Sequence, residues 1–188
     1  MRRALLPLAV VLLVASACTD PPDKELHQAQ GAIDAARAAG AEEYAPAELT
    51  AAQTSLAQAK EAVGQRDYRL ALSHALDAGR SAQDAAREAA DQKALVRSEA
   101  ERAIADVTAA VNEVAARVKT LRGARTASAT VATAETTLAD VNRVLQEART
   151  ALTAEKYLEA RSALKGQLER MTGLKAELDA AAGPRRRR

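Results

Sequence analysis

The sequence contains no phenylalanine, no tryptophan, three tyrosines and a single cysteine, Cys18. A lone cysteine excludes a disulfide within the chain. The scarcity of aromatic side chains leaves little for nucleic-acid bases to stack on and few large groups to enclose a small molecule. We therefore expect neither a nucleic-acid partner nor a cofactor.

Proline and glycine are also scarce, with five and eight residues, and most glycines stand between periodic segments. Alanine, the strongest helix former, makes up roughly a quarter of the chain. Charged residues amount to 28% and mix both signs, which is typical of solvated helix faces. This composition predicts an all-α protein, an elongated antiparallel helical bundle of the coiled-coil type.

The 27 basic residues outnumber the 25 acidic ones only because of the two ends of the chain. Arg2 and Arg3 belong to the N-terminal segment, and four arginines, 185–188, form the end of the chain. Without these residues the body holds 21 basic against 25 acidic side chains and carries a net charge of about −4. A body of this sign repels a nucleic-acid backbone.

The first 18 residues have the pattern of an export signal. Arg2 and Arg3 form a positive start, and an apolar run of about eleven residues, 4–14, follows, which is too short to span a bilayer. The run leads through the letters ASAC into Cys18. This pattern resembles the lipobox of bacterial lipoproteins. The resemblance implies cleavage between Ala17 and Cys18, lipidation of Cys18, and a membrane partner through the lipid anchor. An ordinary signal peptide, with secretion of an unanchored protein, is the alternative.

The residues after Cys18 bear on location. In the lipoprotein sorting that the resemblance implies, aspartate directly after the cysteine favours the inner membrane. Here Thr19 holds that position and Asp20 comes one place later. We therefore expect an anchor in the outer membrane that faces the periplasm. Pro21 and Pro22 make the tether short and stiff.

Apolar residues recur every three or four positions along most of the remaining chain, which predicts amphipathic helices. The expected helices cover residues 22–39, 45–63, 68 to about 122, 128–153 and 157–181. Asp20 is expected to cap the first helix, Gly40 to end it, and Asp67 to cap the long one. The polar triplet 91–93 interrupts the apolar stripe of the long helix, and we expect a kink or a change of packing partner there.

The chain repeats itself at a distance of 89 residues. This shift places Leu49 on Leu138 and Tyr68, which follows a tight turn, on Tyr157. The other matched pairs are Ala45 and Ala134, Leu56 and Leu145, Ala59 and Ala148, Lys60 and Arg149, and Ala71 and Ala160. We infer a duplication, with independent heptad patterning as the alternative. Because short turns make neighbouring helices antiparallel, the predicted architecture is two three-helix units that share the long central helix.

The predicted domain boundaries follow from these features. They are a lipoprotein signal peptide, 1–17; the lipidated cysteine and tether, 18–22; a first helical bundle unit, 23–91; a second helical bundle unit, 92–182; and a basic tail, 183–188.

Residues 22–78 carry a further resemblance. A proline soon after the cysteine is followed by an alanine-rich run into G-A-x-x-Y-A-P-x-E-L within 35–49, and by the helix start D-Y-x-x-A-L at 67–72. These features resemble the bacterial lipoprotein domain catalogued as domain of unknown function 4398. The resemblance implies an envelope location and a helical fold, and the family has no established activity. Its relatives commonly accompany peptidoglycan-binding modules, and we recognise no such module here. The helix start also resembles the second helix of a tetratricopeptide repeat, which would imply a peptide-binding groove.

No arrangement of residues predicts catalysis or metal binding. His27 and His74 lack further ligands at metal-site spacing, and we expect both on helix surfaces. The sequence shows no glycine-rich phosphate loop, no nucleophile beside a base and no carboxylate pair in an evident cleft. We expect no enzyme. Tyr68 and Tyr157 are interpreted as packing residues near the turns, and Tyr44 as a cover for the end of the bundle.

The strongest candidate for an interaction is the basic tail formed by Arg185, Arg186, Arg187 and Arg188. Its guanidinium groups suit the phosphates of lipopolysaccharide or the carboxylates of peptidoglycan, and a solvated tail without a target is the alternative. The sequence thus favours a non-enzymatic envelope lipoprotein, a helical spacer or scaffold that docks envelope components or proteins. A helical-repeat binding module that captures a peptide or a cell-wall component is the alternative. The oligomeric state is not indicated.

Overall fold

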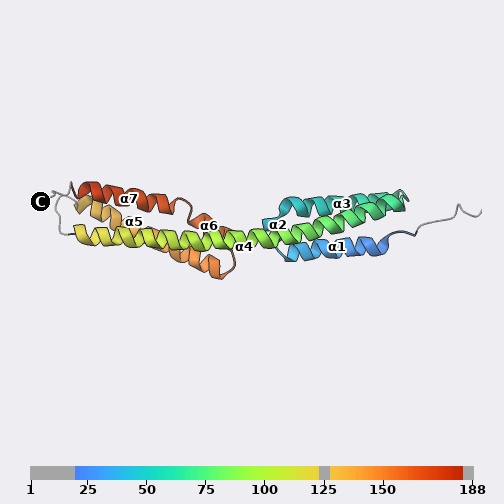
Figure 1. Cartoon of the computed structure of the whole chain (residues 1–188), viewed down its shortest axis with the longest axis horizontal. Coiled ribbons are helices and arrows are strands. Elements are labelled where there is room, and N and C mark those ends of the chain that lie inside the picture. Colours follow the sequence, from blue (N-terminus) through green and yellow to red (C-terminus); the bar gives the residue numbers. More distant parts are fainter. Residues whose placement is uncertain (1–19, 123–127, 184–188) are drawn as a thin grey trace, which may run out of the picture. The chain divides into compact units, whose positions relative to one another are not determined.

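The structure, a computed structural model, describes residues 20–122 and 128–183 (Figure 1). These residues form helices without any strand, which confirms the predicted all-α fold. The helices are α1 (Asp23–Ala38), α2 (Ala41–Tyr44), α3 (Pro46–Gly64), α4 (Tyr68–Leu121), α5 (Ser128–Thr153), α6 (Tyr157–Ala163) and α7 (Gln167–Ala181).

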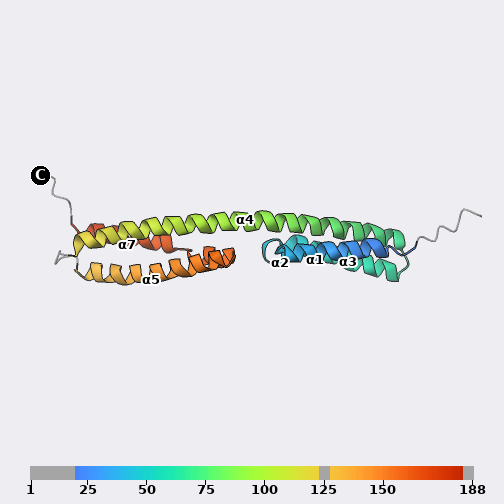
Figure 2. The same ribbon diagram turned by 90° about the horizontal axis from the view of Figure 1, so that it is seen from below.

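The chain divides into two compact units, Met1–Asp91 and Gln92–Arg188. In the first unit, α1, α3 and the first part of α4 lie side by side, and the short α2 joins α1 to α3 (Figure 1). In the second unit, α5 and α7 lie along the remainder of α4 (Figure 2). The 54 residues of α4 are helical throughout, including the polar triplet 91–93 at which the units divide.

Local chemistry accounts for most helix boundaries. Gly40 follows α1 with φ +91°, a left-handed conformation that ends the helix as predicted. Asp67 caps α4, because its carboxylate accepts a hydrogen bond of 3.0 Å from the backbone N–H of Leu70. The expected cap by Asp20 is wrong. Two prolines delay the start of α1 to Asp23, so its cap residue is Pro22, which makes no side-chain cap hydrogen bond.

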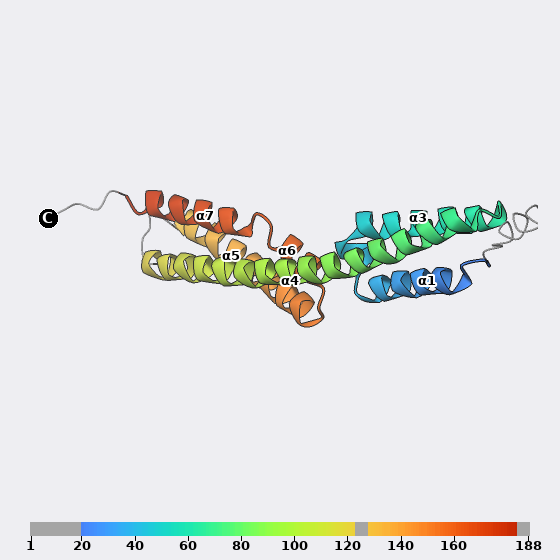
Figure 3. The ribbon, with the colours of Figure 1, turned by 45° about the vertical axis from the view of Figure 1, so that its right-hand side comes forward.

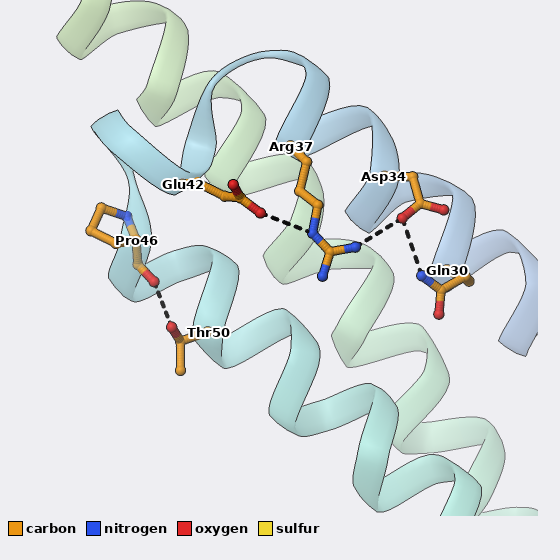
Figure 4. A network of polar contacts seen from close by, with 6 residues as sticks. All are labelled: Gln30, Asp34, Arg37, Glu42, Pro46 and Thr50. Atoms are coloured by element: carbon orange, nitrogen blue, oxygen red, sulfur yellow. Dashed lines mark hydrogen bonds and ion pairs between the residues drawn. The ribbon is translucent and has the colours of Figure 1, made fainter.

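The connection between α1 and α2 is held by exposed charged groups (Figure 4). Arg37, in the last turn of α1, donates a hydrogen bond of 3.0 Å to Asp34 on its own helix. Its Nε lies 3.3 Å from a carboxylate oxygen of Glu42 on α2. Such exposed pairs contribute at most about 1 kcal/mol each, so they orient the turn more than they stabilise the unit.

The predicted single helix over 157–181 is wrong, because two helices occupy this range. α6 ends at Ala163, and α7 begins after Gly166, which has φ +77° (Figure 3). A left-handed residue cannot continue a right-handed helix, and glycine adopts this conformation at little cost. Leu164, within the break, remains buried in the core.

Each unit has its own core, and the two cores differ in side-chain size. The first is lined mainly by alanine, with Ala29, Ile33, Ala36, Ala41, Ala45, Leu49, Ala52, Leu56, Ala78, Ala82, Ala85 and Ala89. The second is lined mainly by larger residues, with Val107, Val111, Val114, Val118, Leu121, Val131, Ala134, Leu138, Val141, Leu145, Ala148, Leu164, Met171, Leu174 and Leu178. Because alanine buries little area, the second core stabilises its unit more per residue.

The predicted apolar stripes need small corrections at the ends of α3 and α5. On α3, Ala62 is buried, whereas Val63, which the apolar spacing of three or four residues would bury, is only half-buried. Leu152 on α5 continues the apolar spacing of its helix and is likewise half-buried. Val63 and Leu152 are in the last turns of their helices, directly before the tight turns. Tyr157 is buried as expected, whereas Tyr68 is half-buried.

The structure repeats the turn geometry at the predicted distance of 89 residues. Arg66 and Glu155 are the described non-glycine residues with positive φ, at +61° and +59°. The next residue donates its backbone N–H across the turn in both units, from Asp67 to Ala62 and from Lys156 to Ala151, at 2.9 Å each. Both turns are therefore the same Schellman-type helix end.

The repeat also includes the first helix of each unit, at a different distance. Residues 22–36 and 100–114 match position by position in whether each residue is buried, half-buried or exposed. The two segments are 78 residues apart. Ala29, Ile33 and Ala36 thus correspond to Val107, Val111 and Val114. Each unit consists of three equivalent helices, and the second unit has eleven additional residues between the first and second of them.

Candidate functional site

The predicted processing site and basic tail lie outside the described residues. This applies to Ala17, Cys18 and the arginines 185–188. The nearest described residues are Asp20, two positions after the cysteine, and Gly183 at the other end.

The sequence predicts both histidines on helix surfaces, and the structure exposes them to different degrees. His27 is exposed and His74 is half-buried. Within residues 20–122 and 128–183, no three histidine, cysteine, aspartate or glutamate side chains gather as they would around a metal ion. The Lys93 ammonium lies 5.7 Å from the ring centroid of the buried Tyr157, a favourable cation–π distance.

A ladder of ion pairs joins α4 to the parallel segment 155–179 in the second unit. Each pair joins residues that are 62 positions apart. The pairs are Lys93 with Glu155 at 3.1 Å, Glu99 with Arg161 at 2.7 Å, Glu113 with Lys175, and Arg117 with Asp179 at 2.7 Å. The constant separation defines one register between α4 and the whole segment 155–179, on both sides of the α6–α7 break, and the mixed signs along α4 disfavour a slip by one turn.

The hydrogen bond from Lys175 to Glu113, together with the charge of that carboxylate, raises the pKa of Lys175 above its ordinary value. The pKa of Arg97 is raised in the same way by the hydrogen bond to Glu101 on the same helix. Both basic groups therefore stay charged in the folded protein at any physiological pH.

The ladder is interrupted between Glu99 and Glu113, and a groove of about 600 Å³ opens there. It lies between α4 and the α6–α7 break. The groove is lined by Ala103, Asp106, Val107, Arg161, Ser162, Leu164, Lys165, Gly166, Leu168 and Glu169. Its apolar lining includes Leu168, a large hydrophobic side chain that is 40% exposed. Carboxylates and basic groups stand around it, so the groove suits an apolar side chain flanked by polar groups.

The first unit has an equivalent groove of about 400 Å³ between α1 and α4. It is lined by Glu25, Gln28, Ala29, Ala32, Ala75, Leu76, Gly79, Arg80 and Gln83. Ala75, Leu76 and Gly79 occupy the positions of Leu164, Lys165 and Leu168 in the second unit. The grooves are thus a property of the repeated fold.

The sequence did not predict these grooves, although it contains a signal for each. Gly166 lies inside a range that the periodicity assigns to one helix, and glycine in a helix interior is unfavourable by about 1 kcal/mol. Leu76 and Leu168 lie off the buried stripes, and their side chains are 54% and 40% exposed.

None of the helices in residues 20–122 and 128–183 combines the length and the apolar character that crossing a bilayer requires. No protein-family model, no curated protein and no solved structure matches the chain. The resemblances described above therefore stay predictions.

Proposed function

We propose that this protein is a non-enzymatic lipoprotein of the bacterial envelope, anchored through a lipidated Cys18 in the outer membrane and facing the periplasm. One observation carries the proposal: the only cysteine of the chain ends a lipobox-like ASAC and lies five residues before α1 begins at Asp23. A helical body attached this closely to an acyl anchor is suited to act as a spacer or scaffold at the membrane surface.

The fold supports a scaffold role through its internal register. The ladder of ion pairs and the valine- and leucine-rich core fix α4 against α5 and α7 in the second unit. A bundle with a fixed register presents a constant surface to partners. The basic tail is the proposed contact with lipopolysaccharide phosphates or peptidoglycan carboxylates.

The anchor is tested by substitution of Cys18 and by mass spectrometry of the mature N-terminus. The native chain is expected in the membrane fraction, with an N-terminal peptide that carries diacylglycerol and an acyl chain on Cys18. Cys18→Ser is expected to lose both the lipid mass and the membrane association. A Thr19→Ser variant is the matched control, because it changes a neighbouring hydroxyl residue and keeps the cysteine. Unmodified Cys18 in the native chain would reject the proposal.

The tail is tested separately by a chain that ends at Pro184. The described helices end before this point, so the deletion leaves both cores intact. We expect weaker co-sedimentation with isolated peptidoglycan sacculi or with outer-membrane vesicles, depending on the target. Unchanged co-sedimentation with both would remove the tail from the proposal and leave the anchor in place.

The second candidate function is a helical-repeat module that captures a peptide or a cell-wall component. The equivalent grooves of the two units favour it. Leu168→Glu places a charge in the larger groove, and Leu95→Glu is a matched control, since Leu95 is exposed but lies outside the groove. A ligand of the groove would lose affinity with the first variant and keep it with the second. Equal affinity for both variants would reject the binding-module function.

A further inference from the structure

One end of the first unit combines exposed leucines with exposed arginines. The α3–α4 turn and the start of α4 lie at the same end of this unit as the start of α1 (Figures 1 and 3). Leu70 and Leu72, in the first turns of α4, are 42% and 38% exposed. Arg66, in the turn, and Arg69 are also exposed. We refer to Arg66, Arg69, Leu70 and Leu72 as the end patch.

The register between α1 and α4 follows from the repeat, which gives a separation of 51 residues. The equivalent helices of the second unit are paired by the ladder at 62 residues, and eleven of these residues have no counterpart in the first unit. The groove of the first unit is compatible with this value, because its lining takes Glu25 and Gln28 from α1 and Leu76 and Gly79 from α4.

This register places the end patch beside the start of the described chain. At a separation of 51 residues, Leu72 lies level with Pro21. Cys18 is three residues before Pro21, so it lies at most about 11 Å further along the chain. Neighbouring helix axes are only about 8–10 Å apart, so chain length alone keeps an anchor on Cys18 within about 20 Å of the end patch.

The charges at this end have both signs, because the exposed Asp20, Asp23, Glu61 and Asp67 stand near the two arginines. The carboxylate of Asp67 is engaged as the cap of α4, and Asp23 stands in the first turn of α1. Both aspartates are at helix N-termini, where the helix dipole offsets their charge. Arg66 follows the end of α3, where the helix dipole favours a cation, whereas Arg69 is in the first turn of α4 and has no such compensation from its helix.

We propose that the end patch is a second, non-covalent contact with the membrane, in which Leu70 and Leu72 enter the interface and Arg66 and Arg69 bind anionic phospholipid headgroups. This inference rests on the proposed anchor at Cys18. Membrane anchoring by a few weak signals acting together is physically effective, since the tether keeps the patch at high local concentration near the bilayer. The second contact would hold the first unit in one orientation instead of leaving it free to swing on the tether.

The absence of tryptophan makes the contact measurable with single-tryptophan variants of the lipidated full chain. Leu70→Trp and Leu72→Trp report on the end patch. Glu43→Trp is the control, because Glu43 is exposed on α2 at the other end of α1, about 24 Å away for a helix of 16 residues. The proteins are reconstituted in vesicles of phosphatidylethanolamine and phosphatidylglycerol in which part of the lipid carries brominated acyl chains, which quench tryptophan at the bilayer.

We expect the Leu70→Trp and Leu72→Trp variants to be quenched at least about five-fold more strongly than the Glu43→Trp variant. Arg66→Gln and Arg69→Gln are then added to the Leu72→Trp variant. Each is expected to lower the ratio of molecules with a membrane-bound end patch to molecules with a free end patch about five-fold. The same pair of substitutions is expected to have little effect in phosphatidylcholine vesicles, which carry no net charge. Circular dichroism of each variant checks that the helical content is unchanged.

The outcomes separate this inference from the proposed function. Co-sedimentation with the vesicles and a lipid mass on Cys18, combined with equal quenching at positions 43, 70 and 72, would overturn the membrane contact and leave the anchor standing. Absence of the lipid mass and of co-sedimentation would overturn the anchor and the contact together. Strong quenching that does not depend on the arginines would overturn the assignment of headgroup binding to Arg66 and Arg69.

Discussion

The difference between the two cores predicts a reciprocal effect of exchanging their residues. Ala89 in the first unit and Leu178 in the second occupy equivalent positions, 89 residues apart, and both are fully buried. Leu178 belongs to a core of large side chains, whereas the helices around Ala89 are separated by alanine. Leu178→Ala should therefore leave a cavity, and Ala89→Leu should overfill a narrow space.

The expected magnitudes follow from burial. Leu178→Ala removes about three methylene-sized groups from a site with no exposure, which is about 2.4 kcal/mol of transfer free energy. Incomplete collapse of the surrounding helices adds a cavity term, so we expect about 3 kcal/mol of lost stability in the second unit. Ala89→Leu is expected to cost about 1–3 kcal/mol in the first unit through displaced helices.

Hydrogen exchange followed by mass spectrometry assigns each loss to a unit. Leu178→Ala should accelerate exchange in α5 and α7 and leave α1 and α3 unchanged, and Ala89→Leu should do the reverse. Urea titration gives the corresponding free energies of unfolding. An unchanged free energy of unfolding in Leu178→Ala, or an equal acceleration of amide exchange in both units, would contradict the two-core arrangement from which the magnitudes are derived.

Three further predictions concern local features. Asp67→Ala is expected to cost about 1 kcal/mol and to accelerate amide exchange in the first turn of α4, whereas Asp67→Asn should retain the cap; equal effects would contradict the capping role. Gly166→Ala is expected to destabilise the second unit by about 1 kcal/mol because its φ is +77°, while Gly173→Ala, inside α7 with open space around its Cα, should stabilise it by a similar amount. The same sign for both glycines would refute this explanation. The pKa of Lys175 is raised in the folded state, so the stabilisation from its pair with Glu113 is present below the unfolded pKa of 10.5 and is lost as the pH rises through the folded value. Lys175→Arg keeps its charge in that range, and thermal unfolding above pH 10.5 should therefore decline less for this variant than for the native chain.

The sequence was sufficient for the helices whose stripes are regular and whose ends carry strong signals. Residues 128–153 form a helix with the predicted bounds, since a clean heptad of valine and leucine leaves only one face to bury. Gly40 and Asp67 act as predicted, because each determines a helix end by its own conformation or side chain. These features depend on neighbours along the chain, which are visible in the sequence.

Features that depend on packing between helices were missed. The apolar spacing continues through 157–181, so periodicity alone favours one helix, and Gly166 is a weak signal against it because single glycines also occur inside helices, as Gly173 does in α7. The grooves depend on the register of parallel helices that are far apart in sequence. The candidate processing site at Cys18 could be proposed from its motif, but a motif alone does not determine which helix surface lies beside it.

The two shifts of the repeat locate the difference in length between the two units. The first helices correspond at 78 residues and the later ones at 89, so the second unit has eleven more residues than the first between the positions of Ala36 and Ala45, which correspond to Val114 and Ala134. Eleven residues are close to three turns of an α-helix. The eleven further residues lengthen α4 and the start of α5, and the apolar stripe still faces the core. The further turns bury Val118, Leu121 and Val131, which have no counterpart in the first unit. A longer helical hairpin of this kind gains buried area without a change of register in the later helices, and the turns at Arg66 and Glu155 accordingly lie 89 residues apart with the same geometry.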